Sequence, residues 1–339
     1  MNGYFRFDLA MDKSLLLFPR IVKIYRKRTC VPLQGSSITV QDINMFFDQC
    51  MRQNNDSANK RREQVLVMLY DPPYAFINNS DYGKRWKLLS DAWKESITFL
   101  SKAGDFKPYT SVKMTLKAGR KFHYDADMAF MDGKTIVASK KIEFKHNCSS
   151  IAKLPQFLSL STKTPLFPVS YERFYYENYI DQYIVQDPSI TVQKPDIEPY
   201  LTLVTGINYD SHPFFSQLKC RDSFFKEAKN RVVNASISDY LQRYGSSISK
   251  EAICERIRST QKDKIYLLWS TKDCRFNIDE IQSSEMDRLG YHGIKNNNTL
   301  VLFSGTTYYS LLLRWRNHKG ILNPAWQISM KRNETNHEI

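Results

Sequence analysis

This sequence of 339 residues lacks the local patterns that identify several classes of protein. Its six cysteines are far apart and form no CxxC pair, which argues against a zinc knuckle and a disulfide framework. No GxxxxGK[ST] loop is present, so a built-in ATP-driven motor is not expected. The apolar run from Leu15 to Phe18 is too short to cross a bilayer. We therefore expect an intracellular protein with reduced thiols, in the cytoplasm or nucleus, without a signal peptide or a transmembrane segment.

Acidic residues are too few to balance the basic ones, because 35 Asp and Glu face 49 Lys and Arg and leave a net charge of +14. This excess favours a polyanionic partner, with nucleic acid first and an anionic membrane surface second. Acid is absent from residues 13–41, 107–121 and 288–333, which hold six, five and seven basic residues. A charge run is often only a solvated surface. Three acid-free runs together favour phosphate contacts, so we expect nucleic acid, most of all DNA, and no membrane.

Hydrophobic spacing predicts a chain that mixes helices and strands. Apolar residues recur at intervals of three and four over 81–103, which predicts a helix ending at Gly104. Two strand-like segments, 121–131 and 135–145, follow and are joined through Asp132-Gly133, a hairpin signal. Polar residues 54–62 are interpreted as a linker before the strand-like segment 64–70. Further along, we predict helices over 150–160, 171–184 and 223–244 and strands over 264–269, 299–303, 308–316 and 321–330.

These elements predict an α/β (mixed α+β) protein in three parts. Residues 1–75 form an N-terminal accessory subdomain, and residues 76–165 contain the helix and hairpin. Residues 166–339 are a helical insertion followed by a C-terminal strand-rich basic region.

The hairpin carries the residues with the most distinctive chemistry. In its second strand, Glu143 and Lys145 share one face while Phe144 points to the other, and Asp125 and Asp127 share a face of the first strand. An antiparallel hairpin can therefore gather two or three carboxylates and one lysine. Carboxylate oxygens bind Mg²⁺ or Mn²⁺, and the ion and a lysine together can promote phosphodiester hydrolysis.

The spacing of Asp127, then fifteen residues, then Glu143-Phe144-Lys145 resembles the PD-(D/E)XK (restriction-endonuclease-like) nuclease superfamily, although Ala126 stands where the motif has proline. The resemblance implies a restriction-endonuclease-like core, a central mixed sheet flanked by helices, between N-terminal and C-terminal additions. It implies Asp127, Glu143 and Lys145 as catalytic residues. Asp127 is preferred to Asp125 as the metal ligand because apolar residues follow it directly.

Two weaker members complete the implied catalytic set. The acid on the preceding helix would be Glu95, which we expect to face the sheet and to bind the metal. Asp125 is the remaining candidate metal ligand. A glutamine on the following helix would be Gln156. A strict two-residue turn at Asp132-Gly133 would pair Asp127 with about Ala138, so a wider loop or a bulge is needed to bring either aspartate to Glu143.

The expected function is a Mg²⁺- or Mn²⁺-dependent nuclease acting on DNA, as an endonuclease. The alternatives are a non-catalytic nucleic-acid-binding protein and an RNA endonuclease with the same site. Glu143 and Lys145 can alternatively be a surface ion pair on a half-exposed hairpin. A second acid-x-lysine triplet, Glu227-Ala228-Lys229, lies in a helical pattern and is interpreted as a solvated helix face. A homodimer is possible. The residues expected to contact nucleic acid are Lys113, Lys117, Arg120, Lys121, Arg314 and Arg316.

Overall fold

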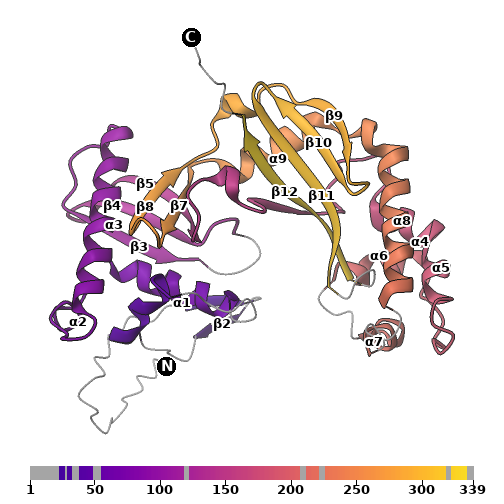
Figure 1. Cartoon of the computed structure of the whole chain (residues 1–339), viewed down its shortest axis with the longest axis horizontal. Helices are drawn as coiled ribbons and strands as arrows, with labels where there is room; N and C mark the ends of the chain where they lie inside the picture. Colours follow the sequence, from indigo (N-terminus) through magenta and orange to yellow (C-terminus); the bar gives the residue numbers. More distant parts are fainter. Residues whose placement is uncertain are drawn as a thin grey trace, which may run out of the picture. The chain divides into compact units, whose positions relative to one another are not determined.

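The computed structural model describes residues 23–26, 29–32, 38–48, 55–117, 122–206, 211–220, 226–317 and 322–333. They fall into two compact units (Figure 1). Unit 1 consists of Met1–Ser150 and Asp263–Glu280, and unit 2 of Ile151–Lys262 and Ile281–Ile339. These boundaries differ from the divisions at 75 and 165 expected from the sequence. Both units combine helices with a five-stranded sheet, which confirms the mixed α and β class.

Unit 1 is built on a sheet with the strand order β3-β4-β5-β7-β8. Neighbouring strands are antiparallel except β5 and β7, which are parallel. The strands are β3 (Ser111–Leu116), β4 (Ala126–Asp132), β5 (Thr135–His146), β7 (Lys264–Ser270) and β8 (Arg275–Asp279). The other elements are β1 (Lys23–Arg26), β2 (Thr29–Pro32), the 3₁₀ helix η1 (Val40–Phe46), α1 (Asn55–Met68), α2 (Tyr74–Ile77) and α3 (Gly83–Ala103).

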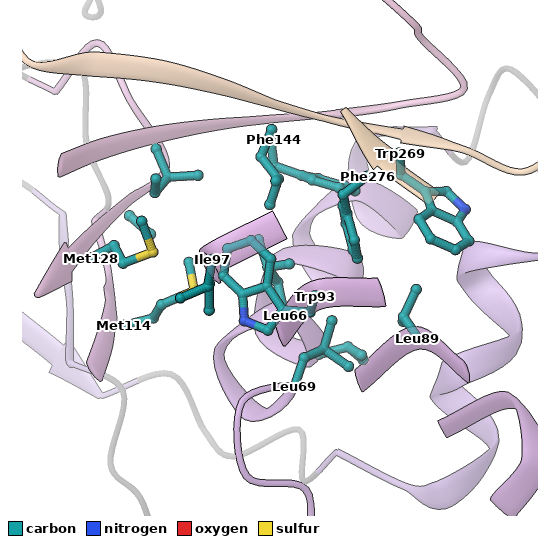
Figure 2. Close-up of a cluster of buried hydrophobic side chains, with 14 of the residues drawn as sticks. Leu66, Leu69, Leu89, Trp93, Ile97, Met114, Met128, Phe144, Trp269 and Phe276 are labelled. Atoms are coloured by element: carbon teal, nitrogen blue, oxygen red, sulfur yellow. The ribbon is translucent and has the colours of Figure 1, made fainter. Parts of the chain in front are cut away.

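The core of unit 1 lies between one face of this sheet and the helices η1, α1 and α3 (Figure 2). The predicted apolar stripe of α3 is confirmed, since Leu89, Trp93 and Ile97 are all buried there. Phe144 of β5 points into the same core. Because side chains alternate along a strand, Glu143 and Lys145 project from the opposite face of the sheet.

The predicted hairpin is confirmed, and its register is decided by the turn and by a bulge. Asp132 pairs with Thr135, so the turn consists of Gly133 and Lys134, with Gly133 at φ +57°. Phe130 then pairs with Ala138, because the register shifts between Phe130 and Met131. The turn and the bulge together place Asp127 opposite Lys141.

The linker predicted over 54–62 and the strand predicted over 64–70 are wrong, because Asn55–Met68 form helix α1. The charged residues of the supposed linker are good helix formers, and Arg62 donates a hydrogen bond to Asn59, one turn earlier. The apolar Val65 and Leu66 of the helix, and Leu69 just after it, are buried in the core. The dense spacing of these apolar residues is compatible with a strand as well as a helix. Packing of the segment against the sheet favours the helix.

Unit 2 contains a second five-stranded sheet, with the order β6-β12-β11-β10-β9 and antiparallel neighbours throughout. Its strands are β6 (Leu158–Ser161), β9 (Gly290–Lys295), β10 (Thr299–Ser304), β11 (Thr307–Asn317) and β12 (Leu322–Arg332). The helices are α4 (Tyr171–Asn178), α5 (Ile180–Ile184), α6 (Ile197–Val204), α7 (Pro213–Cys220), α8 (Lys226–Tyr244) and α9 (Lys250–Gln261). Short 3₁₀ helices η3 (Ile151–Lys153), η5 (Gly245–Ser247) and η6 (Ser283–Met286) complete it. No helix of either unit, within the described ranges, is long and apolar enough to cross a membrane.

Two sequence interpretations in unit 2 are wrong. The helix predicted over 150–160 is the 3₁₀ helix η3 followed by strand β6, because Pro155 has no amide hydrogen to continue a helix. Lys229 is also not solvated, since its side chain is 1% exposed and pairs with Asp187 at 3.8 Å. Helices α4 and α5 pack against α8, which explains this burial.

Replacing Phe46 should test how much the packing of η1 against the sheet contributes to stability. The ring is fully buried and lies 5.6 Å from the ring of Phe144 and 5.9 Å from that of Trp269. Phe46→Ala should lower the free energy of unfolding by about 3–5 kcal/mol because it leaves a cavity. Phe99, 64% exposed on α3, is the matched control, and Phe99→Ala should change it by less than about 0.5 kcal/mol. Urea denaturation measures both, and equal losses would contradict this view of the core.

Candidate active site

The side chains that project from the sheet face opposite the core form a compact charged group around Glu143. Glu143 Oε1 lies 2.6 Å from Lys145 Nζ, and Glu143 Oε2 lies 2.6 Å from Lys264 Nζ on β7. Lys264 also donates a hydrogen bond to the carbonyl oxygen of His123 at 2.6 Å. The side chains of Glu143, Lys145 and Lys264 are 14%, 30% and 1% exposed. Both oxygens of one carboxylate are therefore paired with ammonium groups in a largely dehydrated place.

Asp125 completes this group, which we call the Glu143 cluster: Asp125, Glu143, Lys145 and Lys264. The register that pairs Ala126 with Ile142 continues, since the amide of Asp125 donates to the carbonyl of Ile142 at 2.8 Å. The amide of Phe144 donates in turn to Asp125 Oδ2 at 2.9 Å. Within the described part of the chain, Asp125 Oδ1 accepts no hydrogen bond. One carboxylate oxygen beside Glu143 is thus open to a ligand.

Burial and the neighbouring charges shift the pKa values of the cluster in different directions. Burial raises the pKa of Asp125, against the attraction of Lys145. Burial alone would also raise the pKa of Glu143, but the neighbouring Lys145 and Lys264 lower it overall. Burial lowers the pKa of Lys264, whereas the carboxylates of Glu143 and Asp125 outweigh burial at Lys145 and raise its pKa. Glu143 therefore stays ionised and Lys145 stays cationic, while Asp125 is the carboxyl that holds a proton most readily.

The acid that approaches the cluster from a helix is Glu63, not Glu95. Glu63 of α1 contributes to the raised pKa of Lys145. Glu95 was expected to face the sheet, and this expectation is wrong because Glu95 is exposed. It shares its side of α3 with Phe99, which is also exposed, whereas the buried stripe follows Trp93 and Ile97. Sequence reasoning missed Glu63 because α1 was not recognised as a helix.

Asp127, the preferred ligand from sequence, lies outside the cluster. Its carboxylate forms an ion pair with Lys117 at 2.6 Å and is opposite Lys141 in the ladder. The structure brings Asp125 to Glu143 instead. Lys264 was not singled out in the sequence, where it only begins an apolar strand and carries no motif.

The remaining predicted residues are scattered. Gln156 belongs to unit 2, between η3 and β6, and its buried side-chain oxygen has no hydrogen-bond partner among the described residues. Lys113 is exposed on β3, and Lys117 is paired with Asp127. Arg314 and Arg316 are exposed on β11 of unit 2. Arg120 and Lys121 lie outside the described residues.

The donor chemistry of the cluster fits a hard divalent cation. The described residues contain no group of three or more His, Cys, Asp or Glu side chains arranged to hold a metal. Mg²⁺, however, commonly binds through one or two carboxylates, with water and substrate phosphate as the other ligands. Asp125 and Glu143 would supply those two carboxylates. Glu143 would have to exchange a contact with one ammonium group for the ion.

Replacing Asp125 by asparagine should stabilise the protein. Because burial raises the pKa of Asp125, ionising this carboxyl is harder in the folded chain than in the unfolded chain. The resulting loss of stability develops as pH rises from the ordinary pKa, 3.8, through the raised one, and persists above it. Asp125→Asn should therefore raise the melting temperature at pH 7, with no gain below about pH 3.5.

The matched variant is Asp127→Asn, which removes a carboxylate from a surface ion pair and should change the melting temperature little. Thermal melts at pH 3 to 8 measure both. A lower melting temperature for Asp125→Asn at neutral pH would contradict the assignment.

Glu143→Gln should have the opposite effect, because it leaves the buried ammonium of Lys264 without its carboxylate. Removing one partner of a buried ion pair costs about 3–5 kcal/mol. In the second variant, Glu143→Gln combined with Lys264→Met, most of that loss should be recovered, since the fully buried ammonium of Lys264 is removed together with its carboxylate. Urea denaturation at pH 7 measures the set. An unchanged loss in the double variant would mean that Glu143 acts on stability through other contacts.

Comparison with known proteins leaves the cluster to be interpreted from its own chemistry. The chain matches no protein-family model, no curated protein and no solved structure.

Proposed function

We propose that unit 1 is a metal-dependent nuclease that hydrolyses DNA phosphodiester bonds, as an endonuclease inside the cell. The observation that carries the proposal is the meeting of Asp125 with Glu143 and Lys145 on neighbouring strands, above a buried core. The sheet supports it as well. Three antiparallel strands joined in parallel to β7 make a central mixed sheet, consistent with a restriction-endonuclease-like core.

Each member of the cluster has a distinct part in this proposal. Asp125 and Glu143 would hold Mg²⁺ or Mn²⁺, and the bound ion would polarise a phosphoryl oxygen and acidify a water. Lys145 remains cationic because its pKa is raised, so it can orient the nucleophile and stabilise the charge that develops on the phosphate. Lys264 contacts Glu143 and the chain at His123, and therefore positions the Glu143 carboxylate.

DNA is proposed as the substrate because the net charge of +14 favours a polyanion, and the residues of the cluster do not discriminate against RNA. An RNA endonuclease with the same site is thus the nearest alternative. A protein that only binds nucleic acid is the other, and it requires the Glu143 cluster to be a structural ion-pair network. A partly buried cluster with an open carboxylate oxygen at Asp125 favours the enzyme.

Cleavage assays on linear, circular, single-stranded and branched DNA, with RNA alongside, test the proposal. With Mg²⁺ or Mn²⁺, Asp125→Asn and Lys145→Gln should each lower the cleavage rate by about a hundredfold or more without weakening binding. EDTA should abolish cleavage. Glu143→Ala is a poorer probe because it also unpairs Lys264.

The control variants change an exposed carboxylate and an exposed lysine. Glu198 is 74% exposed and Lys94 is exposed on α3, so Glu198→Gln and Lys94→Gln should cleave at the original rate. Asp127→Asn tests which of the two aspartates binds the metal. If it lowers the cleavage rate as much as Asp125→Asn does, Asp127 is the metal ligand. Full activity in the Asp125 and Lys145 variants would identify the cluster as structural.

A further inference from the structure

The five-stranded sheet of unit 2 contains no Asp or Glu in any strand, and its exposed charges are all positive. Side chains of β11 alternate strictly. Tyr309, Leu311 and Leu313 are buried, whereas the residues between them are partly or fully exposed, as are Arg314 and Arg316. One face of the sheet is therefore packed, and the other, which we call the open face, is available to a ligand.

Aromatic rings gather at one end of the open face. The ring of Tyr308 lies 5.6 Å from that of His292 and 6.4 Å from that of Phe303. Phe303 is 38% exposed, so part of its ring is accessible beside the other two. The three rings come from β11, β9 and β10.

A β-bulge and a glycine determine where the rings of His292 and Phe303 lie. The register of β9 and β10 shifts after Val301, which pairs with Gly293, so that Leu302 pairs with Tyr291 and His292 is the extra residue of a bulge. A bulge redirects a side chain, and the ring of His292 lies 6.4 Å from that of Phe303 at an interplanar angle of 81°. Gly290 lies directly opposite Phe303, and a Cβ at this position would come within 2.4 Å of its ring. The phenyl ring therefore occupies the space that a side chain at residue 290 would need.

Cations and hydrogen-bonding groups continue from the rings across the face. A groove of about 600 Å³ is lined by His292, Lys295, Val301, Tyr308, Ser310 and Lys331. Lys331 pairs across the ladder with Tyr308, which places a cation beside an aromatic ring. Further along β11, Arg314 donates to the side chain of Gln327, and Arg316 to that of Ser159. From residue 308 to residue 316 the strand extends over about 27 Å at the usual rise.

We propose that the open face of unit 2 binds a single strand of nucleic acid, with bases stacked on Phe303 and Tyr308 and phosphates held by Lys295, Lys331 and the two arginines. Stacking on accessible aromatic rings selects unpaired bases, because the bases of a duplex are already stacked on one another. Because the strands carry cations and no acid, the charge of this face is complementary to that of the phosphates. This proposal does not rest on the cleavage chemistry proposed for unit 1.

Binding of labelled oligothymidine and oligouridine of roughly 16 nucleotides, measured by fluorescence anisotropy, tests the proposal. The full chain carries Asp125→Asn and EDTA is present, so that failure of the nuclease proposal cannot alter the result. Phe303→Ala and Tyr308→Ala should each weaken binding about tenfold with the salt dependence unchanged. Phe303→Trp should restore it. Lys295→Gln with Lys331→Gln should flatten the slope of log affinity against log salt by about 1.4.

Matched controls lie on α3 of unit 1, where Phe99→Ala and the pair Lys87→Gln with Lys94→Gln change exposed residues of the same types. These variants should bind like the parent. The proposal is overturned if the single strands do not bind, or if the aromatic variants bind like the parent. It is also overturned if a duplex of equal length competes equally well, since the face would then hold a duplex backbone through its cations alone.

Discussion

The parallel pairing of β5 with β7 is the constraint on which unit 1 depends, because it joins two segments that the first part of unit 2 separates in the chain. The ladder aligns Glu143 with Tyr266 and Phe144 with Leu267. One side of it places Ile265 and Leu267 in the core beside Phe144, and the other side brings Lys264 to Glu143. A shift of one residue would exchange the two faces and lose both the core and the charged cluster.

Burial makes the Glu143 cluster a costly way to stabilise the fold. Two ammonium groups and one carboxylate in a dehydrated place gain little over well-packed apolar residues, because desolvation offsets their attraction. Asp125 makes the net electrostatic free energy of the cluster less favourable, as its raised pKa indicates. Such an arrangement is useful where a phosphate or a cation has to be bound strongly, since charges act over a low dielectric there.

The two sheets differ in the charges that they carry on the face opposite their packed side. In unit 1 the face opposite the core carries paired charges of both signs, so its side chains neutralise one another. In unit 2 the open face carries cations and aromatic rings without an acid in the strands, so a polyanion would complement its charge. Both proposals therefore name nucleic acid, one from catalytic groups and one from charge and stacking.

Local sequence determined much of this protein. The spacing of Leu89, Trp93 and Ile97 identified α3, and the glycine after Asp132 identified the hairpin, because both signals act within a few residues. The same strand alternation correctly placed Glu143 and Lys145 on one face and Phe144 on the other. The acid-free run 288–333 likewise marked the basic strands of unit 2 from composition alone.

Tertiary structure decided which of these residues meet. Asp125 rather than Asp127 lies at Glu143 because a bulge after Phe130 moves the register, and a bulge leaves no distinct signal in the sequence. Glu63 replaces Glu95 because packing against the sheet turned an ambiguous segment into α1. Lys264 reaches the cluster through a parallel partner strand that no local pattern can specify. Propensity and periodicity act along the chain, whereas the contacts that assemble a site depend on register and burial between distant segments.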